Sequence, residues 1–500
     1  MRGKTVPSSR LREGDAVFRF EAGPSLYSGL SPDASPNPLK HVFQMIGEEP
    51  EWITYDVWGA HLPEAPDGYE LSIGAENLKE ILRRYGGPTA VDDWERLSSK
   101  LRPLSKGVQG LPSVAVRNDA WIIATLCLKY PLAFLDVVRN ARAILGPFDM
   151  VSRDSPFYVE DKFLRNYLDL IAFLLQGLPA NSTLTAVMAY MVEDFYREGA
   201  AMDFPKGGSK GIVDALARGV EKWPGCSVRK STAVNRVLVE GGRAVGVETA
   251  RGTRLRARRA VVSNADLRAT YDLVPRGVHE GFDEDRSLLD EITLCKSFMH
   301  VHLAFPADAV PADLPPQWTV CESWNDGEID APGVDGGVVV VSMPTKLDPD
   351  LAPPGYHVIH AYTAGNEPYD LWAPFENAEP NDPDYLALKE LRAKPIFDAI
   401  EKRAPGLRQK AVVEQIASPL THARFLRRHR GNYGPAIAAG NPAGLEFPPV
   451  TTPLPGYYRA GDSTTAGIGV PAVASSGAQC ANAIISVFDQ LRLNKAIRMN

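Results

Sequence analysis

A glycine-rich segment near the C-terminus constrains the fold of this chain more than any other feature. Residues 457–462 read Tyr-Tyr-Arg-Ala-Gly-Asp, and residues 467–474 read Gly-Ile-Gly-Val-Pro-Ala-Val-Ala. This pattern predicts a short strand, a carboxylate at its end, a glycine turn and a helix. Glycine lets backbone N–H groups approach a ligand where a Cβ would clash. Pro471 suits the first turn of a helix, because its missing N–H would have no partner there.

A strand, turn and helix of this kind suits an electron-rich ligand. The positive end of the helix dipole faces the turn, and Asp462 can accept hydrogen bonds from ligand hydroxyls. Both features suit a flavin, with Asp462 for the ribityl chain and the helix start for the pyrimidine edge, which becomes negative on reduction. An ordinary glycine-rich turn has the same spacing, so the pattern alone leaves both interpretations open.

The segment resembles the C-terminal FAD signature of the phytoene desaturase and carotenoid isomerase superfamily. That signature reads Gly-Asp, a loop, and Gly-x-Gly-Val-x-Ala-Val-Ala-x-Ser-Gly, which Ser476 and Gly477 close here. The resemblance extends over nearly the whole chain and is strongest to the isomerase-like branch. Further segments that match in the same order are residues 18–26, 204–208, 347–355 and 433–435.

The resemblance implies a fold class and a cofactor. The fold is α/β, with a Rossmann-like FAD-binding domain of the p-hydroxybenzoate-hydroxylase type and a substrate domain of mixed sheet and helices. The cofactor is FAD, with Val234 against the adenine and the turn at residues 263–265 nearby. The residues implied to bind the cofactor are Val234, Gly461, Asp462, Gly469, Val470, Pro471 and Ala472.

The chain departs from the superfamily at its start. The superfamily opens with a strand, Gly-x-Gly-x-x-Gly and a helix, and no such unit is present here; Gly241 and Gly242 lie between two strand-like runs and read as a hairpin turn. Either Met1 is an internal methionine of a longer protein, which we favour, or the chain is a truncated paralogue. Truncation would put FAD binding in doubt, because a dinucleotide's pyrophosphate normally sits on that helix.

The sequence pattern divides the chain into five parts. Residues 1–40 read as the remnant of an FAD-binding domain, and residues 41–200 as a helical region that faces substrate or membrane. Residues 201–275 return to the FAD-binding domain. Residues 276–430 form the sheet of the substrate domain, in which Val338 to Val341 predict a central strand, and residues 431–500 form the C-terminal FAD-binding segment.

The helical region contains two apolar runs, at residues 121–128 and 167–175. Neither reaches the roughly twenty apolar residues that span a bilayer. They are either buried core helices or a monotopic surface that dips into lipid to admit a hydrophobic substrate. The second interpretation, a peripheral membrane contact, stays open because the superfamily's carotenoid substrates dissolve in membranes.

Composition limits the partners and the compartment. A net charge of −7 gives no reason to expect nucleic acid. Five scattered cysteines favour reduced thiols in an intracellular compartment. No targeting segment is visible. By resemblance we expect a plastid location in a photosynthetic eukaryote, and otherwise a cytoplasmic protein at the membrane periphery.

Two clusters of basic and histidine residues have structural interpretations. His300 and His302 alternate on one face of a predicted strand. That spacing could serve a metal, but no further ligands are apparent, so a partly buried structural pair is favoured and no metal is expected. The basic run from Arg424 to Arg430 reads as a solvated helix face, with Arg427 or Arg430 as alternative partners of the FAD pyrophosphate.

The resemblance implies a long hydrophobic polyene, a carotenoid, as substrate. A desaturase passes a hydride to oxidised flavin while a base takes the neighbouring proton, whereas an isomerase uses reduced flavin to weaken one C=C bond without net redox. The Ala-Val-Ala run resembles the isomerase-like branch, which slightly favours isomerase or saturase chemistry over desaturation. The acid or base cannot be chosen from sequence among Glu193, Asp194, Asp203 and Glu322.

The sequence leaves two other functions open. The chain could be a truncated, non-catalytic relative that binds a carotenoid or a protein partner. An amine-oxidase-like flavoenzyme is a further alternative, although it needs an aromatic cage that a linear sequence cannot show.

Overall fold

In the computed structural model, the backbone follows the predicted mixture of helices and strands, so the α/β class is confirmed. The structure describes residues 11–499 apart from 14–15, 22, 24–25, 118, 177–178, 198, 293, 325–336, 364, 366, 436–447 and 466. Met1, Ala466 of the glycine-rich loop and part of the 18–26 match therefore lie outside the described residues.

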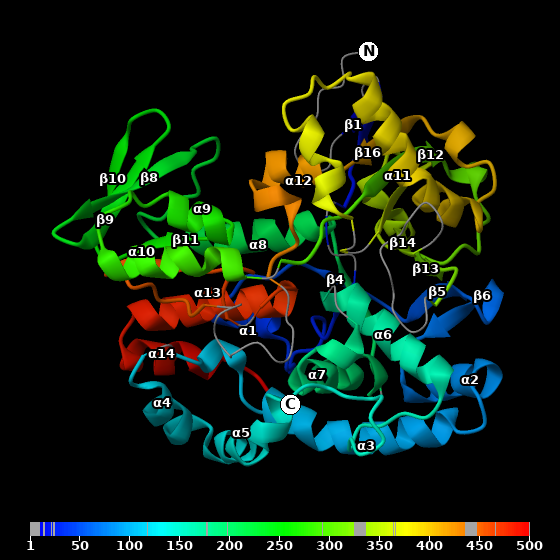
Figure 1. The fold of residues 1–500 in the computed structure, drawn as a ribbon, viewed down its shortest axis with the longest axis horizontal. Helices are drawn as coiled ribbons and strands as arrows, with labels where there is room; N and C mark the ends of the chain where they lie inside the picture. The colour runs from blue at the N-terminus through cyan, green and yellow to red at the C-terminus, as the bar shows by residue number, and fades with distance from the viewer. Residues whose placement is uncertain are drawn as a thin grey trace.

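A seven-stranded mixed sheet forms the centre of the larger part of the molecule, on the right in Figure 1. Its neighbours pair antiparallel, except that β13 and β5 are parallel. Residues 57–72 therefore share a sheet with residues 300–417, and the five-part division of the chain stays a prediction. The strands in spatial order are β16 (Val413–Ala417), β12 (His300–Pro306), β15 (Tyr356–Thr363), β14 (Val338–Ser342), β13 (Gln317–Cys321), β5 (Val57–Leu62) and β6 (Ala65–Ser72).

The predicted central strand at Val338 to Val341 is confirmed as β14, which is buried along its whole length. Side chains alternate between the two faces of a strand. Val338 and Val340 belong to one hydrophobic core, and Val339 and Val341 belong to another. Both faces of the sheet are covered, which explains why the run has no polar alternation.

Helices cover the two faces. Helix α11 (Pro383–Glu401) packs on the face of Val339 and Val341. The opposite core is built with side chains of α2 (Ala75–Tyr85), α3 (Ala90–Gln109), α6 (Lys162–Gln176) and α7 (Thr185–Tyr196).

Smaller sheets lie toward the other end, on the left in Figure 1. The predicted hairpin is confirmed: β8 (Val234–Glu240) pairs with β9 (Arg243–Thr249), and Gly241 and Gly242 both have positive φ in the turn. Strand β10 (Arg254–Arg256) extends this sheet. Beside it, β11 (Val261–Ser263) pairs in parallel with β17 (Tyr457–Arg459).

The C-terminal pattern is also confirmed as strand, turn and helix, because β17 is followed by α13 (Val470–Ile484). Helix α13 packs on α1 (Pro38–Ile46). The remaining elements that bear on the site are β3 (Tyr27–Ser28), β4 (Trp52–Tyr55), β7 (Met202–Pro205), α4 (Ile122–Lys129), α5 (Pro131–Ile144), α8 (Ser209–Glu221), α12 (Pro419–Leu426) and α14 (Val487–Leu493).

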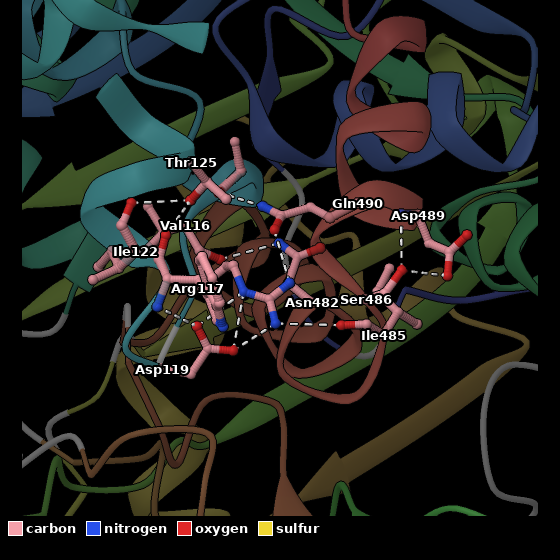
Figure 2. A network of polar contacts seen from close by, with 12 residues as sticks. Val116, Arg117, Asp119, Ile122, Thr125, Asn482, Ile485, Ser486, Asp489 and Gln490 are labelled. Atoms are coloured by element: carbon pink, nitrogen blue, oxygen red, sulfur yellow. Dashed lines mark hydrogen bonds and ion pairs between the residues drawn. The ribbon is translucent and has the colours of Figure 1, made fainter. Parts of the chain in front are cut away.

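A buried polar network ties the segment before α4 to the C-terminal helices (Figure 2). Arg117 forms an ion pair with Asp119 and donates to Gln490 Oε1 at 2.9 Å. Gln490 in turn donates to the carbonyl of Ala115 at 2.7 Å, and Asn482 donates to the carbonyl of Val116 at 3.0 Å. The base of the α4–α5 hairpin is therefore fastened to both α13 and α14.

Candidate functional site

A cavity of about 600 Å³ lies where α7, the start of α13, the β3–α1 segment and the ends of β12 and β15 meet. Of the predicted cofactor residues, Asp462 and the consecutive residues 469–472 line this cavity. Val234 and Gly461 are not among its lining residues. Val234 lies in β8 and is 39% exposed.

Gly461 contributes to the local backbone rather than to the cavity wall. Its N–H donates to Ser476 Oγ of α13 at 2.8 Å. A Cβ at this position would meet Asn264 Nδ2 at 2.4 Å, and φ is +110°. The positive φ and the close approach to Asn264 after β11 therefore both favour glycine at this position.

The start of α13 is open toward the cavity. Gly469 has φ +92°, and a Cβ built on it would meet no described atom within 4 Å. Among the described residues, no side chain caps the helix at Gly469. The N–H groups of the first helical turn have no acceptor within the helix, so this end offers free donors and the positive end of a dipole to a ligand.

Asp462 is held at the cavity wall by a basic residue that the sequence analysis did not single out. Arg428 Nη2 lies 2.7 Å from Asp462 Oδ2, and the two side chains are 15% and 28% exposed. Arg428 Nε also donates to the carbonyl of Asn432 at 2.6 Å. This pair leaves Asp462 anchored beside the helix start.

The basic run is not a helix face, in contrast to the prediction. Helix α12 ends at Leu426, and Arg427 and Arg430 both have positive φ. The chain therefore turns twice, and Arg428 is directed inward. Arg430 lies 3.7 Å from Asp370 at the surface, and neither Arg427 nor Arg430 lines the cavity.

Of the four acidic candidates, only Asp194 lines the cavity. Its carboxylate accepts a hydrogen bond from Ser28 Oγ. Burial raises the pKa of Asp194 to about 6, partly offset by that hydrogen bond. Asp203 is buried and accepts from the Leu30 N–H at 2.6 Å, but it does not line the cavity.

The other two acidic candidates pair elsewhere. Glu193 Oε2 lies 3.8 Å from Arg102 Nε, and Glu322 Oε1 lies 3.0 Å from Lys402 Nζ. Neither lines the cavity.

His300 and His302, predicted to be a partly buried pair, are both buried and belong to a larger group. His300 Nδ1 lies 2.8 Å from His360 Nε2, and His300 Nε2 lies 2.8 Å from His422 Nε2. His302 stacks on His360 with ring centroids 4.9 Å apart. Burial lowers the pKa of His422 and His302 to about 4, and that of His300 and His360 well below its ordinary value.

Aromatic rings join this histidine group to the cavity wall. Phe298 packs edge-on against Tyr433, with centroids 4.7 Å apart. Phe298, Tyr433, His300 and His422 all line the cavity. The site thus combines apolar and aromatic walls, an uncapped helix start and neutral imidazoles, a setting suited to an apolar ligand beside an electron-rich one.

Comparison with curated proteins finds relatives that include prolycopene isomerases and a phytoene dehydrogenase. A chloroplastic prolycopene isomerase of Daucus carota is 31% identical over 336 residues, which cover 65% of this chain and 51% of the relative. One of Arabidopsis thaliana is 31% identical over 495 residues, covering 95% of this chain and 76% of the relative. A phytoene dehydrogenase of Streptomyces griseus is 24% identical over 492 residues, which cover 93% of this chain and 86% of the relative. The chain thus spans about half the length of some relatives.

Comparison with solved structures supports the fold. An oxidoreductase from Methanosarcina mazei has a TM-score of 0.52 at 16% identity, covering 94% of this chain and 90% of its own. A protein from Pyrococcus furiosus has a TM-score of 0.52 at 15% identity, and the match covers 97% of this chain and 88% of that protein's chain. No protein-family profile matches the chain.

Two glycines of α13 provide a matched test of the helix start. Gly469 has a left-handed backbone, whereas Gly477 lies inside the helix, and a Cβ on either would meet no described atom within 4 Å. We expect Gly469→Ala to lower the free energy of unfolding by about 1–2 kcal/mol through backbone strain. Gly477→Ala should raise it by about 0.5–1 kcal/mol. Urea unfolding of both variants measures the difference, and shifts of the same sign would contradict the assigned backbone.

Proposed function

Because this chain belongs to the family of prolycopene isomerases and phytoene desaturases, we propose that it is an FAD-dependent enzyme acting on a long hydrophobic polyene. The observation that carries the proposal is the cavity itself. An apolar chamber opens directly onto the uncapped start of α13 and onto Asp462.

The residues at this end of the cavity fit a flavin. The free N–H groups after Gly469 can donate to the pyrimidine edge, and the open space at its Cα admits a flat ring. Asp462 can accept from ribityl hydroxyls. Val470, Pro471 and Ala472 would complete this wall. Bound FAD would supply a reversible acceptor or donor of electrons to the polyene.

Arg428 adds a function that the sequence did not predict. It holds the Asp462 carboxylate in place through an ion pair and brings a positive charge to the same wall. Val234 and Gly461 stay predictions for the adenine side and the strand end, because they lie away from the cavity wall.

The other walls suit a polyene. Helices α6 and α7 and the segment before α1 present apolar side chains that exclude water and hold an extended hydrocarbon by its surface. The principal apolar lining residues are Leu26, Leu174, Leu175, Val187, Met191 and Phe195.

We favour isomerase over desaturase chemistry. The relatives named prolycopene isomerase are 31% identical, and one of them matches along 95% of the chain. The relative named phytoene dehydrogenase is 24% identical over a similar length. The chloroplastic names of the isomerases support a plastid location for a plant version of this chain. A non-catalytic carotenoid binder is the alternative.

The two apolar runs of the helical region prove to differ. Residues 167–175 lie in α6, most of whose apolar side chains are in the core. In α4 and α5, by contrast, large apolar side chains face outward: Leu128 is 74% exposed and Leu132 is 77% exposed, with Trp121 at 59% just before α4. Within the described part of the chain, no helix has the length and hydropathy to cross a bilayer.

We therefore propose that the α4–α5 hairpin, and not α6, makes the membrane contact. Its exposed apolar side chains form a single stretch of sequence, with Ile123, Leu135 and Val138 in addition to the three named above. Such side chains are stabilised by burial in the interfacial region of lipid. The cavity-lining residues Leu111 and Ser113 lie shortly before this stretch, so lipid contact and substrate entry would be close.

The cofactor assignment predicts the effect of Asp462→Asn. Loss of a charged acceptor for ribityl hydroxyls should weaken FAD binding by about 1.5–3 kcal/mol. Titration of FAD into flavin-stripped protein measures this. Asp370→Asn is the control, because Asp370 also faces an arginine but is 85% exposed and lies away from the cavity. Equal FAD affinity in both variants would exclude the assigned contact.

The reaction type is decided by product mass. Purified protein should be yellow, and with reduced FAD it should convert prolycopene to a product of unchanged mass and altered absorption spectrum. Loss of two hydrogens would show a desaturase instead. A flavin-loaded protein that binds the polyene without altering it would favour the non-catalytic alternative.

The membrane assignment predicts weaker vesicle binding after charge is placed on the hairpin. Burial of one leucine side chain in lipid contributes roughly 1.5–3 kcal/mol to the free energy of binding. The double variant Leu128→Glu, Leu132→Glu should therefore bind phosphatidylcholine vesicles at least about tenfold more weakly. Val213→Glu serves as control, since Val213 is 61% exposed on α8. Co-sedimentation measures both, and undiminished binding of the double variant would argue against the hairpin.

A further inference from the structure

Four of the nine histidines of this chain meet in one buried group, with no basic or acidic side chain bonded to their rings in the described structure. A metal site would have nitrogens converging on one point. Here His300 uses opposite ring nitrogens toward its two neighbours, so the nitrogens form a line. Among the described residues, no group of three or more metal-ligating side chains could hold an ion.

The line runs from the cavity wall into the protein. His422 is partly buried and lines the cavity, and so does His300. His360 is fully buried, and its Nδ1 has no hydrogen-bond partner among the described residues. His422 therefore forms the outer end, His300 the middle and His360 the inner end.

Secondary structure holds the three rings in this order. His300 on β12 and His360 on β15 lie on adjacent antiparallel strands, and His360 pairs directly with His302. His422 is delivered from α12, which begins with a Ser418 capping box. Stacking of His302 and Tyr362 on His360, at 4.9 Å and 5.0 Å between centroids, restricts rotation of the inner ring.

Counting ring protons shows what such a line can do. Three neutral imidazoles carry three protons, and the two N···N hydrogen bonds hold two of them. The third sits on a terminal nitrogen, either His422 Nδ1 or His360 Nδ1. An additional proton received at His422 can pass across both hydrogen bonds, so that the extra charge comes to lie on His360.

We propose that His422, His300 and His360 form a proton relay that delivers a proton to the polyene in the cavity and takes it back. This inference rests on the proposed function. The neutral line first takes up one additional proton from solvent; on delivery this proton leaves His422 and forms a C–H bond with the electron pair of one C=C bond, so that the line is neutral again and the polyene carries the positive charge. The remaining single bond can rotate, and return of the proton to His422 restores the double bond. The cycle consumes no oxidant or reductant.

The neutral state of the resting rings supports this assignment. Burial makes the imidazolium form unfavourable, as the lowered pKa of His422 shows. A proton that is held weakly is given up readily, which transfer to carbon requires. His422 would be the catalytic residue, and His300 and His360 would act through it as positioning residues.

Histidine-selective ¹⁵N NMR tests the relay without flavin or substrate. Two strongly downfield imidazole protons are expected, one for each N–H···N bond. His422→Phe should remove the outer signal and slow solvent exchange of the inner one at least about tenfold, since the relay route is closed. His302→Phe, which alters the same stack outside the line, should retain both signals and their exchange rates; His357→Phe is a second control on β15.

The outcomes separate the relay from the proposed function. Absence of both downfield signals in the wild type, or an unchanged inner exchange rate in His422→Phe, overturns the relay. In flavin-loaded protein, His422→Phe and His300→Phe should each lower kcat about a hundredfold, and full kcat in either would also overturn it. A wild type that converts no polyene contradicts the proposed function, and the exchange rates then decide the relay alone.

Discussion

The parallel pairing of β17 with β11 is the contact on which the site depends. It joins residues nearly two hundred positions apart, with Ser263 opposite Arg459. Arg459 is buried and donates to the carbonyls of Pro449 at 2.7 Å and Thr451 at 3.1 Å. Because β17 is locked in this way, the chain that leaves it must turn through Gly461 and Gly469 before α13 can begin, and Asp462 comes to the cavity.

The seven-stranded sheet supplies the opposite side of the site. Its interior strands are buried on both faces, so their registers are set by packing on two cores at once. One consequence is a row of polar rings in an otherwise apolar environment. His300 and His360 can be placed at hydrogen-bonding distance because the strands that carry them cannot slide.

Patterns that depend on neighbouring residues were predictable from the sequence. The apolar run of β14, the Gly241-Gly242 turn and the strand, turn and helix around Gly469 are each set by local chemistry: burial on two faces, positive φ, and a proline in the first helical turn. The structure has all three where the sequence placed them.

Features that depend on distant residues were not predictable in the same way. Nothing near His300 in sequence indicates that His360 and His422 will reach its two ring nitrogens, because strand pairing and the direction of α12 decide this. The sequence also does not distinguish Arg428 from Arg427 and Arg430, because the positive φ of Arg427 and Arg430, which turns Arg428 inward, has no recognisable sequence pattern. The exposure of Leu128 and Leu132 likewise depends on tertiary packing, because an apolar helix is buried only where another element covers it.

The polar network of Figure 2 has a mechanical consequence. Asn482 fastens the stem of the apolar hairpin to α13, the helix whose first turn forms the open end of the cavity, and the pairing of Arg117 with Gln490 fastens it to α14. A helix is stiff along its axis, so a force on the hairpin at a lipid surface would be carried along α13 to Gly469. The glycine turn at the cavity and the apolar hairpin are thus connected through one helix.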